Sequence, residues 1–318
     1  MVKDILVFAL TSSIDLAEEI VGYLGIPLGN CSVKHFEDGE IIVEPGESVR
    51  GKHVFIVQST CRPVSESLME ILICLDSCKR ASVGEVTVVM PYYGYARQDR
   101  KARARQPITS RLVADLLQVA GANRVVTIDL HAPQIQGFFN IPIDDLSAVS
   151  LIGQYFRHKN LSDIVVVSPD HGGATRARKL SDCLDGSAIA IIDKRRSAPN
   201  VSEPLHLIGD VKGKTAIIVD DIIDTGGSLM GCVKMLDDNG AKEIYCACTH
   251  GVFSSDALEK INKSALKEFV ITNSIPLKNK RKKEKIVVLS VGFMLAKVIE
   301  AITNNQPVSN VYDLFNKE

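Results

Sequence analysis

The sequence predicts an α/β protein of two tandem domains, each a mostly parallel sheet flanked by helices. Short apolar, β-branched segments alternate with helical patterns along the whole chain, which is the order that joins parallel strands through helices. Segments such as TAIIVDD are apolar almost throughout, as strands in a sheet covered on both faces must be. The length of 318 residues is also about twice the usual domain length of roughly 150.

The first half alternates expected strands with expected helices. The strands are DILVFAL (4–10), KHVFIVQST (52–60), EVTVVMPYY (85–93) and RVVTIDL (124–130). The helical patterns are SSIDLAEEIVGYLG (12–25), VSESLMEILICLDSCKRAS (64–82) and PITSRLVADLLQVAG (107–121). Parallel strands need long crossover connections, and these helices supply them.

The second half repeats this style. Its expected strands are DIVVVSPD (163–170), SAIAIIDK (187–194), TAIIVDDI (215–222), EIYCACT (243–249) and EFVITNS (268–274). Helical patterns cover GGATRARKLSDCL (172–184) and GGSLMGCVKMLDDNG (226–240). We therefore expect an N-terminal domain of residues 1–147 and a C-terminal domain of residues 148–318.

A weak internal repeat supports this duplication. VRGKHVFIVQST (49–60) aligns with VKGKTAIIVDDI (211–222) at a separation of 162 positions, and the helices that follow align at 161. Asp220 and Asp221 of the second copy correspond to Gln58 and Ser59 of the first. Because the acidic pair occurs once, we expect a ligand site in the second copy only.

Composition argues against several classes of partner. The formal net charge is −1, whereas nucleic acid and anionic membranes attract proteins with a basic surplus or face. No stretch approaches the roughly 18 apolar residues that a membrane span requires, and no export signal is recognisable, so we expect a cytoplasmic protein. The eight cysteines are scattered without a CxxC pair, which predicts buried thiols rather than a metal site.

The chain contains two runs rich in basic residues. RQDRKARAR (97–105) follows three tyrosines and could be a solvated loop or a patch for nucleic acid, but no basic balance elsewhere supports the patch. The lysine-rich run Lys278–Lys285 lies between the expected strands NSIPL and IVVLS. We interpret it as a solvated hairpin loop.

The strongest local signal is TAIIVDDIIDTGGSLMGCVK (215–234), an apolar strand that ends in two carboxylates and leads through glycines into a helix. Backbone N–H groups at a helix start bind phosphate, and Gly226 and Gly227 leave them unobstructed. Thr225 and Ser228 add hydroxyl donors, while Asp220 and Asp221 can accept from ribose hydroxyls. The alternative is a helix that Asp224 merely caps after a core strand.

This run resembles the ribose-phosphate motif of the type I phosphoribosyltransferase fold, and the rest of the chain resembles the class I ribose-phosphate pyrophosphokinases. The blocks that carry the resemblance, in the family's order, are HFEDGE, SVRGKHVFIVQST, PYYGYARQDRKAR, TIDLHAPQIQGFF, VVSPDHGG, IIDKRR, IGDVKGK and VDDIIDTGGS. The resemblance implies two type I phosphoribosyltransferase-like domains. It also implies attack by the anomeric hydroxyl of ribose 5-phosphate on the β-phosphorus of MgATP, which gives phosphoribosyl pyrophosphate and AMP for nucleotide biosynthesis.

The resemblance also assigns site residues. The ATP-binding residues it implies are Phe36, Asp38, Gly39, Glu40, Arg97 and Gln98. The ribose 5-phosphate site would comprise Arg196, Asp220, Asp221, Asp224, Thr225, Gly226, Gly227 and Ser228. Magnesium would be held by His131 and Asp170, with Asp129 nearby, and Lys194 and Arg196 would be catalytic. These roles are chemically reasonable, since Phe36 can stack on adenine and cations can stabilise the transferred group.

The resemblance further implies a homohexamer built from dimers, with phosphate activation and ADP inhibition. Ser48, Arg50 and Arg80 match positions used for such regulation.

Two other functions stay open. A phosphoribosyltransferase that consumes phosphoribosyl pyrophosphate would share DDIIDTGGS, but it would not use HFEDGE or the lysine of IIDKRR. A catalytically silent regulatory relative would not need Lys194, Arg196, His131 and Asp170 intact.

Overall fold

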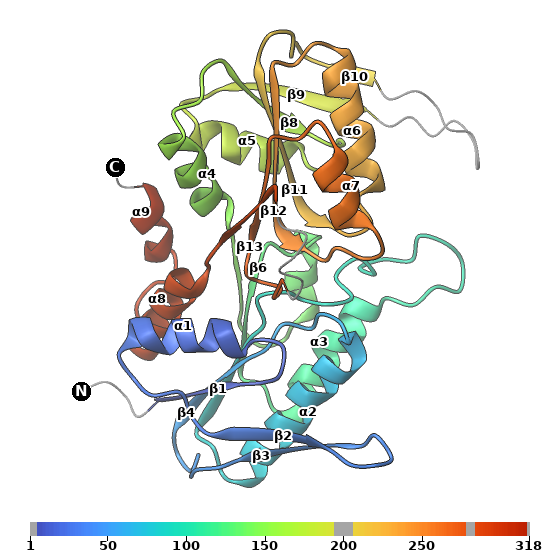
Figure 1. The fold of residues 1–318 in the computed structure, drawn as a ribbon. Helices are drawn as coiled ribbons and strands as arrows, with labels where there is room; N and C mark the ends of the chain where they lie inside the picture. The colour runs from blue at the N-terminus through green and yellow to red at the C-terminus, as the bar shows by residue number, and fades with distance from the viewer. Residues whose placement is uncertain (1–4, 194–205, 278–283, 317–318) are drawn as a thin grey trace. The chain divides into compact units, whose positions relative to one another are not determined.

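The computed structural model describes residues 5–193, 206–277 and 284–316, and Figure 1 traces them. The chain divides into two compact units. The first unit comprises Met1–Ser147, Ser274–Pro276 and Ser290–Val311, and the second comprises Ala148–Asn273, Leu277–Leu289 and Tyr312–Glu318. The expected C-terminal domain, 148–318, therefore differs from the second unit, which lacks residues 274–276 and 290–311.

The first unit is built on a parallel sheet in the order β1-β4-β5-β6-β7. These strands are β1 (Ile5–Ala9), β4 (His53–Val57), β5 (Glu85–Val89), β6 (Arg124–Ile128) and β7 (Ile143–Leu146). Its helices are α1 (Ile14–Leu24), α2 (Val64–Arg80), α3 (Thr109–Ala120) and the 3₁₀ helix η1 (Pro133–Phe138). A separate antiparallel hairpin pairs β2 (Cys31–His35) with β3 (Ile41–Pro45). β4 is buried at every position, as a central strand covered on both faces requires.

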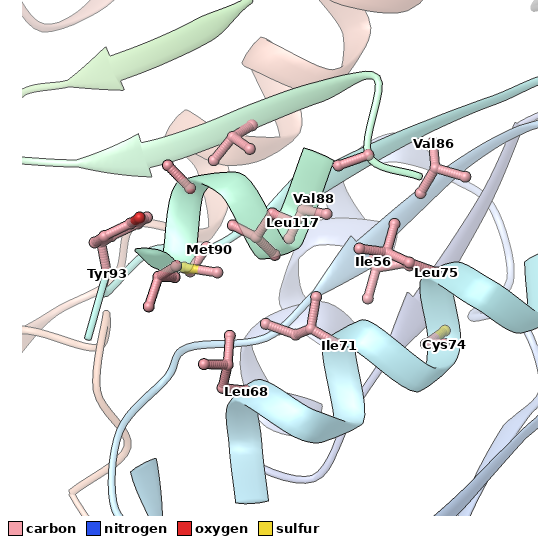
Figure 2. Packing of buried hydrophobic residues seen from close by; sticks show 14 of the residues in the cluster. Ile56, Leu68, Ile71, Cys74, Leu75, Val86, Val88, Met90, Tyr93 and Leu117 are labelled. Atoms are coloured by element: carbon pink, nitrogen blue, oxygen red, sulfur yellow. The ribbon is translucent and has the colours of Figure 1, made fainter. Parts of the chain in front are cut away.

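Helices α2 and α3 lie side by side and cover the sheet with an apolar face (Figure 1). Figure 2 shows Ile71 and Leu75 of α2 turned towards Ile56 and Val88 of the strands, with Leu117 of α3 completing the layer. All five side chains are fully buried. Their removal from water is the main source of stability for this layer.

The second unit contains a mixed sheet in the order β10-β9-β8-β11-β12-β13-β14, in which only β10 is antiparallel to its neighbour among the described pairings. The strands are β8 (Ile164–Ser168), β9 (Ala188–Asp193), β10 (His206–Ile208), β11 (Thr215–Ile223), β12 (Glu243–Gly251), β13 (Glu268–Thr272) and β14 (Ile286–Leu289). The helices of this part of the chain are α4 (Val149–His158), α5 (Ala174–Cys183), α6 (Gly227–Asp238) and α7 (Ala257–Lys263). The predicted fold class, mostly parallel sheets flanked by helices, is confirmed.

The two sheets repeat one strand order. β1-β4-β5-β6-β7 corresponds to β8-β11-β12-β13-β14, and the turns before β4 and β11 have the same geometry. Gly51 has φ of 71° and Gly213 has φ of 72°, a left-handed conformation that glycine adopts without strain. In both turns the following lysine N–H donates to a buried valine carbonyl at 3.1 Å, Lys52 to Val49 and Lys214 to Val211.

The helix that follows the last strand of each sheet belongs to the compact unit that contains the other sheet. α4 follows β7 but packs on α5, and α8 (Gly292–Thr303) follows β14 but packs on α1. Tyr23 of α1 and Phe293 of α8 meet edge to face, with ring centroids 5.4 Å apart, and Ser290 hydrogen-bonds the carboxylate of Glu19. This exchange explains why 290–311 belongs to the first unit. A short helix, α9 (Asn310–Asn316), ends the described chain.

The cysteines behave as the sequence predicts. All eight are free thiols, of which six are buried and two, Cys31 and Cys183, are partly buried. Within the described part of the chain, none of the helices has the length and apolar character needed to cross a bilayer.

Candidate active site

The acidic pair of the second unit lies within strand β11, two positions before its end. The sequence placed Asp220 and Asp221 at the strand end, but β11 continues to Ile223 because Ile222 and Ile223 still pair with β12. The side chain of Asp220 is 26% exposed and that of Asp221 is 7% exposed. Successive strand residues point to opposite faces, so the side chains of Asp220 and Asp221 leave the backbone on opposite faces of the sheet.

The pair is held by backbone and by one cation. Asp220 Oδ1 accepts a hydrogen bond from the backbone N–H of Asp221 at 2.9 Å. Arg176 Nη1, from α5, lies 3.4 Å from Oδ1 of Asp220 and 3.4 Å from Oδ1 of Asp221. Burial, with the neighbouring carboxylate of Asp221, raises the pKa of Asp220 to about 8, although Arg176 acts in the opposite direction. At neutral pH the pair therefore retains a proton.

A glycine turn connects β11 to helix α6. Gly226, the N-cap, has φ of 74° and ψ of −4°, so only glycine adopts this turn without strain. A Cβ atom there would meet Ala257 Cβ at an ordinary 3.7 Å, which means that the backbone conformation and not space selects glycine. Thr225, Gly227 and Ser228 are exposed around the first turn.

The start of α6 has the properties of an anion site. The first N–H groups of an α-helix have no partner within the helix, and the helix dipole favours negative charge there. Asp224 precedes the turn and its carbonyl accepts from Ser254 N at 3.1 Å, which fixes the approach of the chain to the helix. The predicted residues 224–228 thus form one continuous turn beside the Asp220 and Asp221 strand.

In the first unit, residues 36–40 form the loop of the β2–β3 hairpin. Phe36 N donates to Glu40 O at 2.8 Å, and Glu40 N donates to Asp38 Oδ1 at 3.0 Å. Gly39 has φ of 91°, and the Phe36 side chain is 54% exposed. An exposed ring on a closed loop is available for stacking on a flat ligand.

Arg97 and Gln98 are exposed in the segment that follows β5. Gln98 Oε1 accepts from Thr109 Oγ1 at 2.5 Å, and Gln98 O accepts from Ser110 N at 3.2 Å. This segment is thereby tied to the start of α3.

The two predicted ATP-binding segments both adjoin the first turn of α2. His35, which ends β2, has Nε2 3.8 Å from Glu66 Oε2. Ser65 Oγ lies 3.4 Å from the Tyr95 hydroxyl, two residues before Arg97. Residues far apart in sequence therefore approach the same helix end within the first unit.

The predicted metal residues are divided between the two units. In the first unit, Asp129 has φ of 42° and its Oδ1 accepts from Ser147 Oγ at 2.9 Å, while His131 is exposed. In the second unit, Asp170 is exposed and its Oδ1 accepts from Gly173 N at 3.0 Å. Across the described ranges, no group of three or more His, Cys, Asp and Glu side chains is arranged to hold a metal ion.

Within each unit, taken separately, the donors are of a kind that magnesium can use when it is bound with a substrate. Magnesium keeps several waters and takes one or two carboxylates with substrate phosphates, so a cage of protein ligands is not required. A carboxylate has about four acceptor sites, and the hydrogen bonds of Asp129 and Asp170 are compatible with metal ligation. The imidazole of His131 is the less usual donor in this set, since magnesium prefers oxygen.

The predicted catalytic residues Lys194 and Arg196 lie outside the described residues, directly after β9. The last residue of that strand, Asp193, has Oδ1 3.0 Å from His171 Nε2, which ties the end of β9 to the loop of Asp170.

Most of the lysine-rich run Lys278–Lys285 also lies outside the described residues. The hairpin expected there is wrong, because β13 and β14 are parallel neighbours and NSIPL forms no strand.

Sequence reasoning gave no role to Arg176. Its signal was present in GGATRARKLS, where it is the third residue of α5 after a glycine pair. Nothing local relates this arginine to a strand that begins 39 positions later, so only the parallel pairing of β8 with β11 brings them together.

Comparison with known proteins identifies the family. Residues 5–121 match the N-terminal domain of ribose phosphate pyrophosphokinase, and residues 188–313 match the phosphoribosyl synthetase-associated domain. A ribose-phosphate pyrophosphokinase of Bacillus caldolyticus is 56% identical over 306 residues, which is 96% of this chain and 97% of that protein. The Bacillus subtilis enzyme of the same name is 54% identical over 310 residues, 98% of each chain.

A solved structure agrees with the sequence matches. Phosphoribosylpyrophosphate synthetase from Mycobacterium smegmatis superposes with a TM-score of 0.90 at 41% identity, covering 95% of this chain and all of that one. Both halves of the fold and nearly the whole length are therefore shared. The chain belongs to the ribose-phosphate pyrophosphokinase family of enzymes.

Proposed function

We propose that the chain transfers the pyrophosphoryl group of MgATP to the anomeric hydroxyl of ribose 5-phosphate, giving 5-phosphoribosyl 1-pyrophosphate and AMP for nucleotide biosynthesis. The observation that carries this proposal is the order of three structural features along β11 and α6 in the second unit. A buried carboxylate pair on β11 is followed by a left-handed Gly226 and the open amide turn of α6. Family membership over 96% of the chain supports the same reaction.

Ribose 5-phosphate binds to β11 and α6 in this proposal. Its phosphate occupies the amide turn, where Thr225 and Ser228 add hydroxyl donors. The ribose hydroxyls donate to Asp220 and Asp221, and the single negative charge that the pair keeps at neutral pH strengthens these hydrogen bonds. The other proposed ribose 5-phosphate-binding residues are Asp224, Gly226, Gly227 and Arg196.

ATP binds through the two segments beside α2. Phe36 stacks on the adenine, and the hairpin loop of Asp38, Gly39 and Glu40 contacts the nucleoside. Arg97 provides planar donors to phosphate oxygens, with Gln98 beside it. The anchoring of Gln98 to Thr109 and Ser110 supports this role, because a fixed segment binds with less loss of entropy.

The chemical step displaces AMP from the β-phosphorus of ATP. His131 and Asp170, with Asp129 nearby, would hold magnesium, which would neutralise charge at the phosphates. Lys194 and Arg196 stabilise negative charge on the transferred group, and Arg196 also contacts the ribose phosphate. The ribose hydroxyl is positioned by the Asp220 and Asp221 pair, which leaves the anomeric oxygen as the nucleophile.

We also propose a homohexamer built from dimers. Leu112, Leu116 and Val119 form an exposed apolar stripe on α3, and such stripes mark association surfaces. The regulatory residues Ser48, Arg50 and Arg80 are exposed, and Arg50 bridges to Val83 just past α2, the helix that ends at Arg80. An anion site formed by these residues would bind phosphate and ADP.

A cytoplasmic location completes the proposal. Eight free thiols suit a reducing compartment, and ATP is available there. The partners we expect are ATP, ribose 5-phosphate and further copies of the chain, without nucleic acid or membrane.

One assay tests the reaction. Purified protein is supplied with MgATP and ribose 5-phosphate, and the nucleotide products are separated by chromatography. AMP formed in equal amount with phosphoribosyl pyrophosphate is expected. ADP as the product, or no turnover, would reject the proposed reaction, and consumption of added phosphoribosyl pyrophosphate with a nucleobase would indicate a phosphoribosyltransferase instead.

A further inference from the structure

Arg176 is the cation that the structure brings to the acidic pair of β11. One guanidinium nitrogen, Nη1, lies 3.4 Å from a carboxylate oxygen of Asp220 and 3.4 Å from one of Asp221. The Arg176 side chain is 18% exposed, so water screens these contacts poorly. The contacts join helix α5 to strand β11 across the interior of the second unit.

We infer that Arg176 is a positioning residue for ribose recognition, which holds Asp220 and Asp221 in the arrangement that accepts the vicinal hydroxyls of the sugar. This inference rests on the proposed function, because it deepens the same site. In this role Arg176 does not contact the substrate. It acts through the two carboxylates.

The physical reason is the repulsion between adjacent buried carboxylates. Two such groups cannot both ionise cheaply without a cation, and a protonated carboxyl accepts fewer hydrogen bonds than a carboxylate. A guanidinium remains charged at every relevant pH and presents its donors in a fixed plane. Arg176 therefore opposes the burial and the carboxylate repulsion that raise the pKa of Asp220, and it fixes the geometry of the pair.

The helix that carries Arg176 is held in place by its packing. It is the third residue of α5, and α5 packs against β8, β9 and β11. The loop before α5 is also closed by the hydrogen bond from Gly173 N to Asp170 Oδ1. A side chain that leaves a packed helix near its first turn loses little further entropy when it holds the pair.

The duplicated unit provides an internal comparison. In the first unit the third residue of α1, the helix that corresponds to α5, is Leu16, which is buried. The matching strand end has Gln58 and Ser59, which bond to groups of the protein itself: Ser12 donates to Gln58 Oε1 at 2.8 Å, Gln58 Nε2 donates to Glu70 Oε2 at 2.7 Å, and Ser59 N donates to Ser13 Oγ at 2.9 Å. The arginine and the acidic pair thus occur together in one copy and are absent together from the other.

A purely structural role predicts a different result. If Arg176 only stabilised the fold, its loss would lower thermal stability and would change the kinetic constants for both substrates alike. A positioning role for ribose predicts a selective loss of ribose 5-phosphate affinity. It also predicts partial rescue by lysine, which restores the charge but not the planar geometry.

The test compares Arg176→Gln, Arg176→Lys and Arg178→Gln. Arg178 is exposed on the same helix, so its variant controls for general loss of positive charge. Affinity for ribose 5-phosphate alone is measured by isothermal titration calorimetry, KM and kcat come from AMP formation, and the melting temperature reports the fold.

We expect Arg176→Gln to weaken ribose 5-phosphate binding by about tenfold or more, the loss typical of a charge-assisted contact. The KM for ATP and the kcat should change by less than about threefold, Arg176→Lys should recover part of the affinity, and Arg178→Gln should match the parent. Unchanged affinity in Arg176→Gln would overturn the inference. Should that variant not fold, a folded Arg176→Lys with the parent's affinity would also overturn it. Absence of AMP from the parent would reject the proposed reaction instead, because the calorimetry does not depend on turnover.

Discussion

Gln58 Nε2 donates a hydrogen bond of 2.7 Å to Glu70 Oε2 in the interior of the first unit. Both residues are buried, and the same carboxylate accepts from Thr11 Oγ1 at 2.6 Å and Thr11 N at 3.1 Å. The strand end that corresponds to the acidic pair of β11 is therefore filled by the protein's own hydrogen-bonding groups. This arrangement supports the prediction that the ribose site lies at the strand end of the second copy and not at that of the first.

Substitution at the two strand ends should separate stability from substrate binding. Gln58→Asn shortens the side chain by one methylene and weakens its bonds to Ser12 and Glu70, which should cost about 1–3 kcal/mol of unfolding free energy. The KM for ribose 5-phosphate should stay unchanged. Asp220→Asn should instead raise that KM sharply. Urea denaturation and AMP kinetics measure both effects, and equal kinetic damage from the two changes would contradict a single ribose site.

A pair of glycine substitutions should show that the turn before α6 depends on its left-handed residue. Gly226→Ala places a side chain at φ of 74°, which should destabilise the protein by about 1–3 kcal/mol. Gly227→Ala is the matched control, because its Cβ meets only Thr225 Oγ1 at 3.9 Å and alanine favours helices. Thermal denaturation compares the two variants. Equal melting temperatures would show that the turn relaxes without glycine.

The raised pKa of Asp220 predicts how stability responds to pH. Burial and Asp221 raise it from 3.8 to about 8, so the folded chain binds this proton more tightly than the unfolded chain. The stabilising contribution is complete below about pH 3.8 and is lost as pH rises through about 8. Asp221, Arg176 and the thiol of Cys248 surround this group.

Asp220→Asn removes that linkage. Between pH 5 and 8 the unfolding free energy of the variant should therefore decline less with rising pH than that of the parent, by up to about 1 kcal/mol per pH unit. Denaturant titrations across this range measure the slopes. Identical slopes in the two proteins would show that Asp220 titrates as an ordinary exposed carboxyl.

Substitution of His131 should change the magnesium requirement. His131→Ala removes one proposed contact to the metal, so more magnesium should be needed for half-maximal AMP formation. His158→Ala is the control, because His158 is exposed on α4 and its Nδ1 contacts Gln154 O at 2.8 Å. An unchanged magnesium titration in the His131 variant would remove this residue from the metal site.

Loss of Lys194 should act on the chemical step. Removing one preorganised donor to the transition state commonly lowers kcat by about 100- to 1000-fold, and Lys194→Ala should fall in or beyond that range with much smaller changes in KM. Arginine should rescue only partly. Steady-state AMP formation is measured with circular dichroism as the check of folding. Retention of more than about a tenth of kcat would transfer the catalytic role to Arg196.

The sequence by itself determined the local features of this protein. Alternating apolar segments and helical patterns predicted the sheets flanked by helices, because side-chain periodicity decides local structure. The run from Asp220 to Ser228 predicted carboxylates followed by a phosphate-binding turn, since glycine and helix N-terminal geometry are also local properties. The repeat at Gly51 and Gly213 predicted the duplication, and both glycines have the same left-handed conformation.

Tertiary structure alone decided which distant groups meet. Arg176 reaches Asp220 only because β8 and β11 pair as parallel neighbours, and Glu70 satisfies Gln58 only because α2 covers the first sheet. The exchange that packs α8 on α1 is likewise invisible in the chain order. Each of these contacts joins elements whose local sequences are equally compatible with other partners, so the packing of complete apolar faces selects among them.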